Sequence, residues 1–235
     1  MAPTGVTNVF SSKGDVAYAE VRRLILTGEL TAGSRVPQYE LAERLSMSIT
    51  PLREAIRRLS SEGLVTVESH RDVRVAAMSA EEARQLFEVR LSLDPTAAEL
   101  AALRRSDRDI LVMREALDRL LPVTRQWGEE GLLAHRNFHR ALYLASHNDV
   151  LIRLLDDVWD KSDRYRRMGL ELPPGDEPRT RDLNEHHRLF DLVVAGDGPA
   201  AAALMRSHIT ESLTAAAIRA LQDRENSADT AAEPA

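Results

Sequence analysis

The sequence predicts a mainly α protein, with an N-terminal winged helix-turn-helix followed by an antiparallel, all-helical bundle. Three observations support this fold class. Aromatic residues make up only 4% of the 235 residues and hydrophobic residues 43%, a balance that favours packed helices over sheets. Apolar residues recur at helical spacing along most of the chain. In residues 15–76 the order of elements is helix, helix, turn, helix and hairpin.

The chain is long enough for one large domain or two small ones. We expect a winged helix-turn-helix domain over residues 15–76 and a larger helical domain over residues 79–224. Residues 1–14 and 225–235 lack hydrophobic periodicity and are rich in small and polar residues, so we expect flexible ends. With no cysteine, disulfides and thiolate chemistry are excluded. No stretch is apolar enough for a signal peptide or a membrane span, which predicts a soluble, cytosolic protein without a membrane partner.

Each element of the first domain has its own signal. Val16, Val21, Leu24 and Ile25 share one helix face, and Gly28 ends that segment. A second short helix is expected over 38–45. A third is expected over 50–62, with Thr50 as its cap and proline at its first position. The buried stripe of this third helix is predicted to consist of Leu52, Ala55, Ile56 and Leu59. The two strands of the hairpin are expected over 64–67 and 73–75.

The second domain is predicted from helical patterns separated by Gly, Pro and Asn. Ser79 and Glu82 form a capping box that opens the first helix, which Pro95 is expected to kink or divide. Short connections between the helices that follow indicate an antiparallel bundle. These helices are expected over 107–126, 130–146, 150–168, 177–195 and 199–223.

The segment LTGELTAGSRVPQYELAERLSMSITPLREAIRRLSSEGLV resembles the DNA-binding domain of the GntR superfamily of bacterial transcription regulators. The resemblance covers some 60 residues, and its most specific part is the S-x-T-P-x-R-E-A core at 48–55. The sequence departs from the family at Ile49, where Arg is common, and at Asp72, where the wing tip commonly has Gly. The first departure removes one base or phosphate contact, and the second leaves the wing geometry open.

A recognition helix enters the major groove with its N-terminus first, so Ser48, Thr50 and Arg53 are expected to face DNA. Hydroxyl groups suit phosphate oxygens, and an arginine fork suits guanine. Arg57 and Arg58 lie one turn further on, within reach of phosphate. The alternative interpretation is that these arginines form an ordinary solvated helix face. His70 and Arg71, at the tip of the wing, are candidates for the minor groove or the backbone.

The formal net charge of -6 argues against a nucleic-acid partner only when the chain is taken whole. Residues 1–75 hold 10 basic and 9 acidic residues, which gives +1, and the remaining residues give -7. The acidity therefore belongs to the second domain, while five arginines of the first gather near the expected DNA face: Arg53, Arg57, Arg58, Arg71 and Arg74.

Six of the seven histidines lie in the second domain. His135 and His139 are four residues apart, so they share a helix face and could hold one ion together. His186 and His208 come from helical patterns that follow, and bundles build metal sites from ligands on facing helices. His187 is expected to face away. His147, the sixth, is expected near a helix end.

The segments HRNFHRALYLASHND, EHHRLFDLVVAGD and AALMRSHI resemble the ligand-binding FCD domain of the FadR-like GntR branch. The resemblance places His139, His186 and His208 on the three histidine positions of a family metal site, and His135 where the family usually has Asp. Four imidazoles favour borderline metals, so we expect Zn²⁺ first and Ni²⁺ second, with Mg²⁺ and Ca²⁺ disfavoured. The alternative is that these histidines bind an anion directly.

The resemblance also implies a dimeric regulator, most often a repressor, that binds a double-stranded, pseudo-palindromic operator under control of a small carboxylic acid. Arg90 is a candidate for holding the effector carboxylate, and a structural salt bridge is its alternative role. A metalloenzyme that activates water is the competing class, but no HExxH or comparable pairing supplies a general base. A nucleoid-type binder would not need an acidic bundle. We therefore expect a regulator and not an enzyme.

Overall fold

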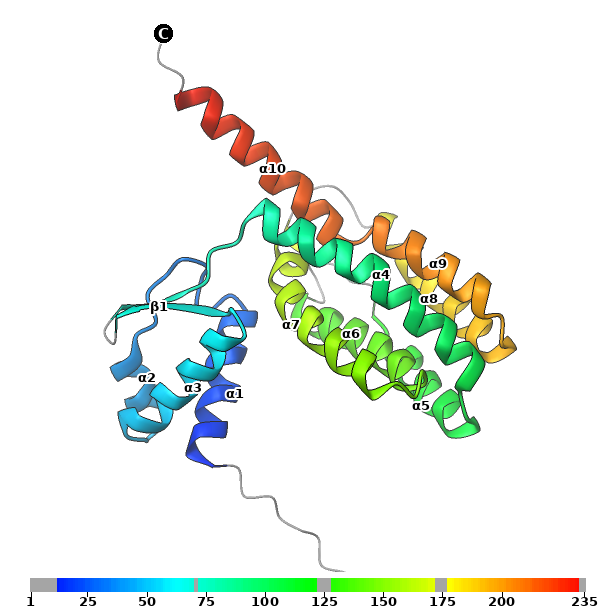
Figure 1. Cartoon of the computed structure of the whole chain (residues 1–235), viewed down its shortest axis with the longest axis horizontal. Helices are drawn as coiled ribbons and strands as arrows, with labels where there is room; N and C mark the ends of the chain where they lie inside the picture. Colours follow the sequence, from blue (N-terminus) through cyan, green and yellow to red (C-terminus); the bar gives the residue numbers. More distant parts are fainter. Residues whose placement is uncertain (1–11, 70–71, 122–127, 172–176, 233–235) are drawn as a thin grey trace, which may run out of the picture. The chain divides into compact units, whose positions relative to one another are not determined.

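The computed structural model of the chain describes residues 12–69, 72–121, 128–171 and 177–232 (Figure 1). It divides into two compact units, Met1–Ala77 and Met78–Ala235. In the described part of the chain, no helix is both long and apolar enough to cross a membrane.

The first unit is a winged helix-turn-helix, as predicted. Leu52, Leu59 and Leu64 lie fully buried at its centre, packed against the first helix and the hairpin. The two strands pair antiparallel, with Val65 opposite Val75. The elements in chain order are α1 (Lys13–Leu26), α2 (Gln38–Arg44), α3 (Ile49–Ser61), β1 (Val65–Ser69) and β2 (Asp72–Val75).

Two helix starts differ from the prediction. Helix α1 begins at Lys13, inside the predicted flexible end, because Ser12 and Asp15 form a reciprocal capping box. Helix α3 begins at Ile49, and its N-cap is Ser48 and not Thr50. Thr50 therefore lies in the first turn of the helix, where its side chain projects outward and is exposed.

The second unit is entirely helical in its described residues, which confirms the predicted fold class (Figure 1). The predicted helix over 199–223 is two helices, with a break at Glu211 and Ser212. Residues 225–232, predicted as part of a flexible tail, continue the last helix, since three alanines and a glutamate favour that conformation. The helices are α4 (Ala80–Arg104), α5 (Asp107–Asp118), α6 (Gly128–Leu144), α7 (Asp149–Glu171), α8 (Glu177–Ala195), α9 (Gly198–Thr210) and α10 (Leu213–Ala232).

Helix α4 is the central element of this unit and packs against α6, α7, α8, α9 and α10. It carries fully buried alanines, among them Ala98 and Ala102, whose small side chains allow neighbouring helices to approach closely. At Gly198, where α9 begins, a Cβ atom would lie 3.3 Å from the carbonyl oxygen of Glu99. This close packing fixes α9, and with it the position of His208.

Pro95 neither divides nor ends α4. A proline has no N–H, so the carbonyl oxygen four residues earlier, on Leu91, loses its helical partner. Arg206 of α9 replaces that partner, because its NH1 atom donates to this oxygen at 2.9 Å. The helix therefore continues through the proline, with a side chain from a distant helix satisfying the backbone.

Candidate functional site

Helix α3 separates a buried face from an outward face. Leu52, Ala55, Ile56 and Leu59 are buried, as their spacing predicted. On the outward face, the candidate DNA contacts Ser48, Thr50 and Arg57 are exposed, and Arg53 is half-buried.

The approach to this helix leaves its N-terminus accessible. Ser46 holds the turn with a φ of 51°, a left-handed conformation that a residue other than glycine adopts at some cost. The hydroxyl of Ser48 makes no capping bond, so it is not used by the helix itself. Arg58, by contrast, donates to Asp15 at 2.8 Å and lies 4.0 Å over the ring of Tyr18, so it is already engaged inside the unit.

The wing brings together charges of both signs. Asp72 at the start of β2 lies 3.4 Å from Nε of Arg74 and 3.8 Å from Nε of Arg35. The carboxylate at the family's glycine position therefore neutralises part of the positive charge beside the hairpin. His70 and Arg71, the predicted contacts at the wing tip, lie outside the described residues.

The second candidate site is a cluster of four buried histidines. His135 and His139 come from α6, His186 from α8 and His208 from α9, and one possible ligand atom from each lies within 4.8 Å of the others. The imidazole rings of His186 and His208 have centroids 4.6 Å apart. The remaining histidine of α8, His187, is exposed, as predicted.

Burial keeps three of these imidazoles neutral. Loss of solvent lowers the pKa of His135, His139 and His186 well below the usual 6.5, and neighbouring positive charges, including Arg166, lower it further. A neutral imidazole has one free lone pair, the form in which histidine binds metal ions. These three histidines therefore need not lose a proton before a ring nitrogen can bind an ion.

Tyr143 sets the tautomer of His139. Burial, together with Asp94, raises the pKa of Tyr143 well above 10, so its hydroxyl keeps its proton. That hydroxyl donates to Oδ2 of Asp94 at 2.8 Å and accepts from Nε1 of Trp159 at 3.1 Å. Because its hydrogen is committed to Asp94, it also accepts from Nδ1 of His139, 3.2 Å away. The lone pair of His139 is therefore on Nε2.

Two carboxylates set the tautomer of His208. Its Nδ1 lies 2.9 Å from Oε2 of Glu185 and 3.2 Å from Oδ1 of Asp182, both on α8. Carboxylates only accept, so Nδ1 carries the hydrogen and Nε2 the lone pair. Hydrogen bonds of this kind orient histidine ligands in metal sites. The sequence reasoning missed both carboxylates, although Asp182 stands four residues before His186, at the spacing that shares a helix face.

The closest contact in the cluster joins two ring nitrogens. Nε2 of His139 lies 3.0 Å from Nε2 of His186. Because Nε2 of His139 carries a lone pair, the two nitrogens share a hydrogen or hold a cation between them. This arrangement fits a metal ion bound by His139, His186 and His208, and imidazole ligands suit Zn²⁺ and Ni²⁺.

Arg90, the candidate effector contact, is buried beside the cluster. Its guanidinium donates to Oδ2 of Asp94 at 2.7 and 3.2 Å and lies 4.3 Å over the ring of Trp159. This is the geometry of the salt bridge that the sequence left open as the alternative. The effector role of Arg90 stays a prediction.

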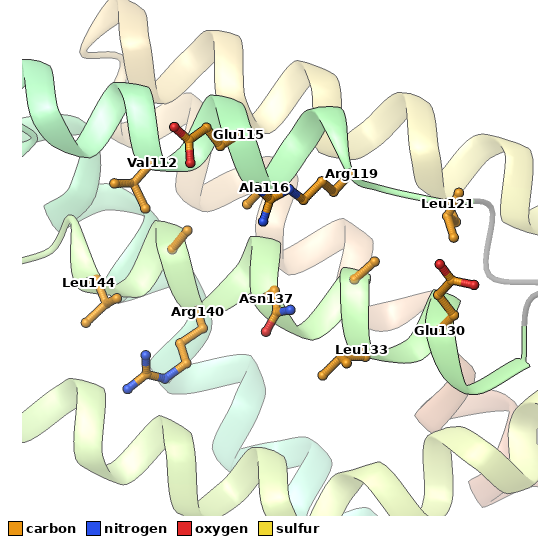
Figure 2. A pocket seen from close by; sticks show the side chains of 12 residues that line it. Val112, Glu115, Ala116, Arg119, Leu121, Glu130, Leu133, Asn137, Arg140 and Leu144 are labelled. Atoms are coloured by element: carbon orange, nitrogen blue, oxygen red, sulfur yellow. The ribbon is translucent and has the colours of Figure 1, made fainter. Parts of the chain in front are cut away.

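A separate groove of about 540 Å³ lies between α5 and α6. Figure 2 shows Arg119, which directly follows α5, with Asn137 and Arg140 of α6 along it. Asn137 and Arg140 are on the exposed face of α6, whereas His135 and His139 are on the buried face. The groove is therefore separate from the histidine cluster.

A winged helix-turn-helix joined in one chain to a helical domain is an architecture typical of transcription regulators. The sequence agrees: residues 13–75 match the model of bacterial regulatory proteins of the gntR family, and residues 85–211 match the FCD domain. The chain belongs to the gntR family, in the branch with an FCD domain. This confirms the resemblance in the sequence, and also that the chain is a regulator and not an enzyme.

Two curated relatives and one solved structure illustrate the likeness. The transcriptional repressor GlaR of Escherichia coli (strain K12) is 28% identical over 82% of this chain and 90% of its own. The transcriptional regulator LutR of Bacillus subtilis (strain 168) is 30% identical over 80% of this chain and 93% of its own. The structure of E. coli McbR/YncC, 22% identical, covers 92% of this chain and all of its own with a TM-score of 0.75, which shows the same fold.

Proposed function

We propose that this regulator acts as a homodimeric repressor whose affinity for a pseudo-palindromic operator is controlled by a small organic acid bound in the helical domain. We also propose that the helical domain holds a divalent metal ion, zinc first and nickel second. The observation that carries the metal proposal is the group of four buried histidines with ligand atoms within 4.8 Å of one another. A regulator of this kind works in the cytoplasm, where its operator is.

The outward face of α3 would read the operator. Ser48 and Thr50 are exposed at its first turn and offer hydroxyl groups to phosphate, while Arg53 and Arg57 follow on the same side. A gel shift with DNA upstream of the regulator's own gene tests this. We expect tight binding that collapses in Arg53→Ala and persists in Arg153→Ala, an exposed arginine of α7. Equal binding by both variants would exclude α3 as the recognition helix.

His139, His186 and His208 would hold the metal ion through nitrogen lone pairs. When bound, a borderline dication supplies a positive charge to which a carboxylate is attracted. Protein purified without a chelator or a histidine tag should contain about one equivalent of metal per chain. We expect loss of that metal in His139→Ala and in His208→Ala, and retention in His187→Ala, which changes an exposed histidine. Unchanged content in the first two variants would refute the site.

The effector would act by preferring one arrangement of the two DNA-binding units in the dimer, since a ligand shifts an equilibrium only through its different affinity for the two states. The repressor named among the relatives supports repression, and we propose that the effector relieves it. Arg90 is the candidate for binding the effector carboxylate, which would take the place of Asp94 as its hydrogen-bond partner.

A thermal-shift screen over organic acids tests the effector, because a ligand that favours the native state raises its apparent stability. We expect a hit whose shift is lost in Arg90→Met and which weakens operator binding. A hit unaffected by that change would remove Arg90 from the effector site. Sedimentation of the free protein tests the homodimer, which a monomer at operator-binding concentrations would refute.

A further inference from the structure

His135 differs from the other histidines of the cluster in its hydrogen-bond partner. Its Nδ1 lies 2.8 Å from NH2 of Arg166, and both side chains are buried. A guanidinium has only N–H donors, so Nδ1 of His135 must accept with its lone pair. A neutral imidazole has one lone pair and one N–H. The hydrogen of His135 is therefore on Nε2, the opposite tautomer to His139 and His208.

The surroundings of Nε2 agree with this assignment. Nε2 of His135 lies 3.6 Å from Oδ2 of Asp182, a group that only accepts hydrogen bonds. Arg166 itself is fixed, because its NH1 donates to Asp163 at 2.7 Å and its guanidinium lies 4.6 Å over the ring of Trp159. Because Arg166 is held in place, the one lone pair of His135 stays on Nδ1 and is directed at the guanidinium, so the ring has none to offer an ion.

We propose that His135 is not a metal ligand: Arg166 fixes it as the Nε2–H tautomer, and the site binds its metal through His139, His186 and His208 alone. The inference rests on the proposed metal site. It also changes the origin of the site's negative charge. The carboxylate expected at position 135 from the family is replaced by Asp182 on α8, which lies near both His135 and His208.

Zinc affinity, measured by competition with a chromophoric chelator, separates ligands from neighbours. We expect His135→Phe, which keeps an aromatic ring in the packing, to change the Kd for Zn²⁺ less than about threefold, and His139→Phe to weaken it more than about a hundredfold. His187→Ala is the control. Equal loss in His135→Phe and His139→Phe would overturn the proposal.

Arg166→Met provides a test in the opposite direction. Without the guanidinium, His135 can move its hydrogen to Nδ1 and offer Nε2 as a fourth ligand, so zinc binding should tighten by about tenfold. The gain should vanish when His135→Phe is added. If zinc binding by the Arg166→Met variant stayed the same or weakened, Arg166 would not be the group that fixes the tautomer of His135.

Long-range ¹H–¹⁵N spectra of the histidine rings in metal-free protein give a reading that does not depend on zinc. The proposal requires Nε2–H for His135 and Nδ1–H for His139 and His208, and a His135 ring with Nδ1–H would overturn it. If the wild-type protein bound no metal, the proposed metal site would fail, whereas the spectra would still decide the tautomer of His135.

Discussion

Removing the two carboxylates beside His208 tests whether α8 orients a metal ligand on α9. Glu185 and Asp182 both lie within hydrogen-bond reach of Nδ1 of His208, at 2.9 and 3.2 Å. Without them the imidazole is free to place its hydrogen on Nε2, the nitrogen assigned to the metal. The ring also loses the contacts that fix its orientation.

The two carboxylates compete for one hydrogen, which sets the expected size of the effect. Loss of a group that orients a metal ligand typically costs 10- to 100-fold in affinity. Because each carboxylate can replace the other, Glu185→Ala or Asp182→Ala alone should weaken zinc binding by less than about tenfold. The double variant should approach ~100-fold, which corresponds to about 2.7 kcal/mol. The two losses should therefore be more than additive.

The assay is a zinc competition titration at neutral pH, with Asp191→Asn as the matched control because Asp191 is an exposed carboxylate on the same helix. Circular dichroism before each titration checks that α8 is intact. If the double variant bound zinc within about twofold of wild type, the carboxylates would not orient His208, and its assigned tautomer would be wrong.

In metal-free protein the free energy of unfolding should fall as the pH drops below 6.5, because the unfolded chain takes up protons that buried His135, His139 and His186 do not; urea titrations at two pH values measure this, and changing His139 and His186 to Phe should reduce the slope. Arg206→Met should cost about 1 kcal/mol in stability, and thermal unfolding should show no such cost in a Pro95→Ala background, where the restored N–H can bond the same carbonyl. Asp72→Asn should tighten operator binding and steepen its salt dependence, since two arginines beside the wing lose their counter-charge; a gel shift over a salt series with unchanged binding would contradict this.

The parts of the fold that local periodicity controls were predictable. The buried stripe of α3 follows from apolar spacing alone. The start of that helix does not, because Ser48 and Thr50 are both good caps and the choice between them depends on the left-handed turn at Ser46. The continuity of α4 through Pro95 depends on Arg206, 111 positions away in the numbering, and no local pattern contains that contact.

The same distinction between local pattern and non-local contacts applies to the histidine cluster. Family spacing predicted which histidines the helices bring together, and all four meet. It could not predict which nitrogen of each ring carries the hydrogen, because the partners that decide this come from non-local contacts. Tyr143 sets the tautomer of His139. Glu185 sets that of His208, and Arg166 sets that of His135.

The fluorescence of Trp159 can report on the histidine cluster, because its indole lies against the cluster. Its ring centroid is 5.1 Å from that of His139, and its Nε1 donates to Tyr143 at 3.1 Å. The fluorescence of this indole is therefore sensitive to the charge and hydrogen bonding of the cluster. The chain has one other tryptophan, Trp127, outside the described residues. In a Trp127→Phe variant, emission from Trp159 would follow metal and effector binding in real time without an added dye.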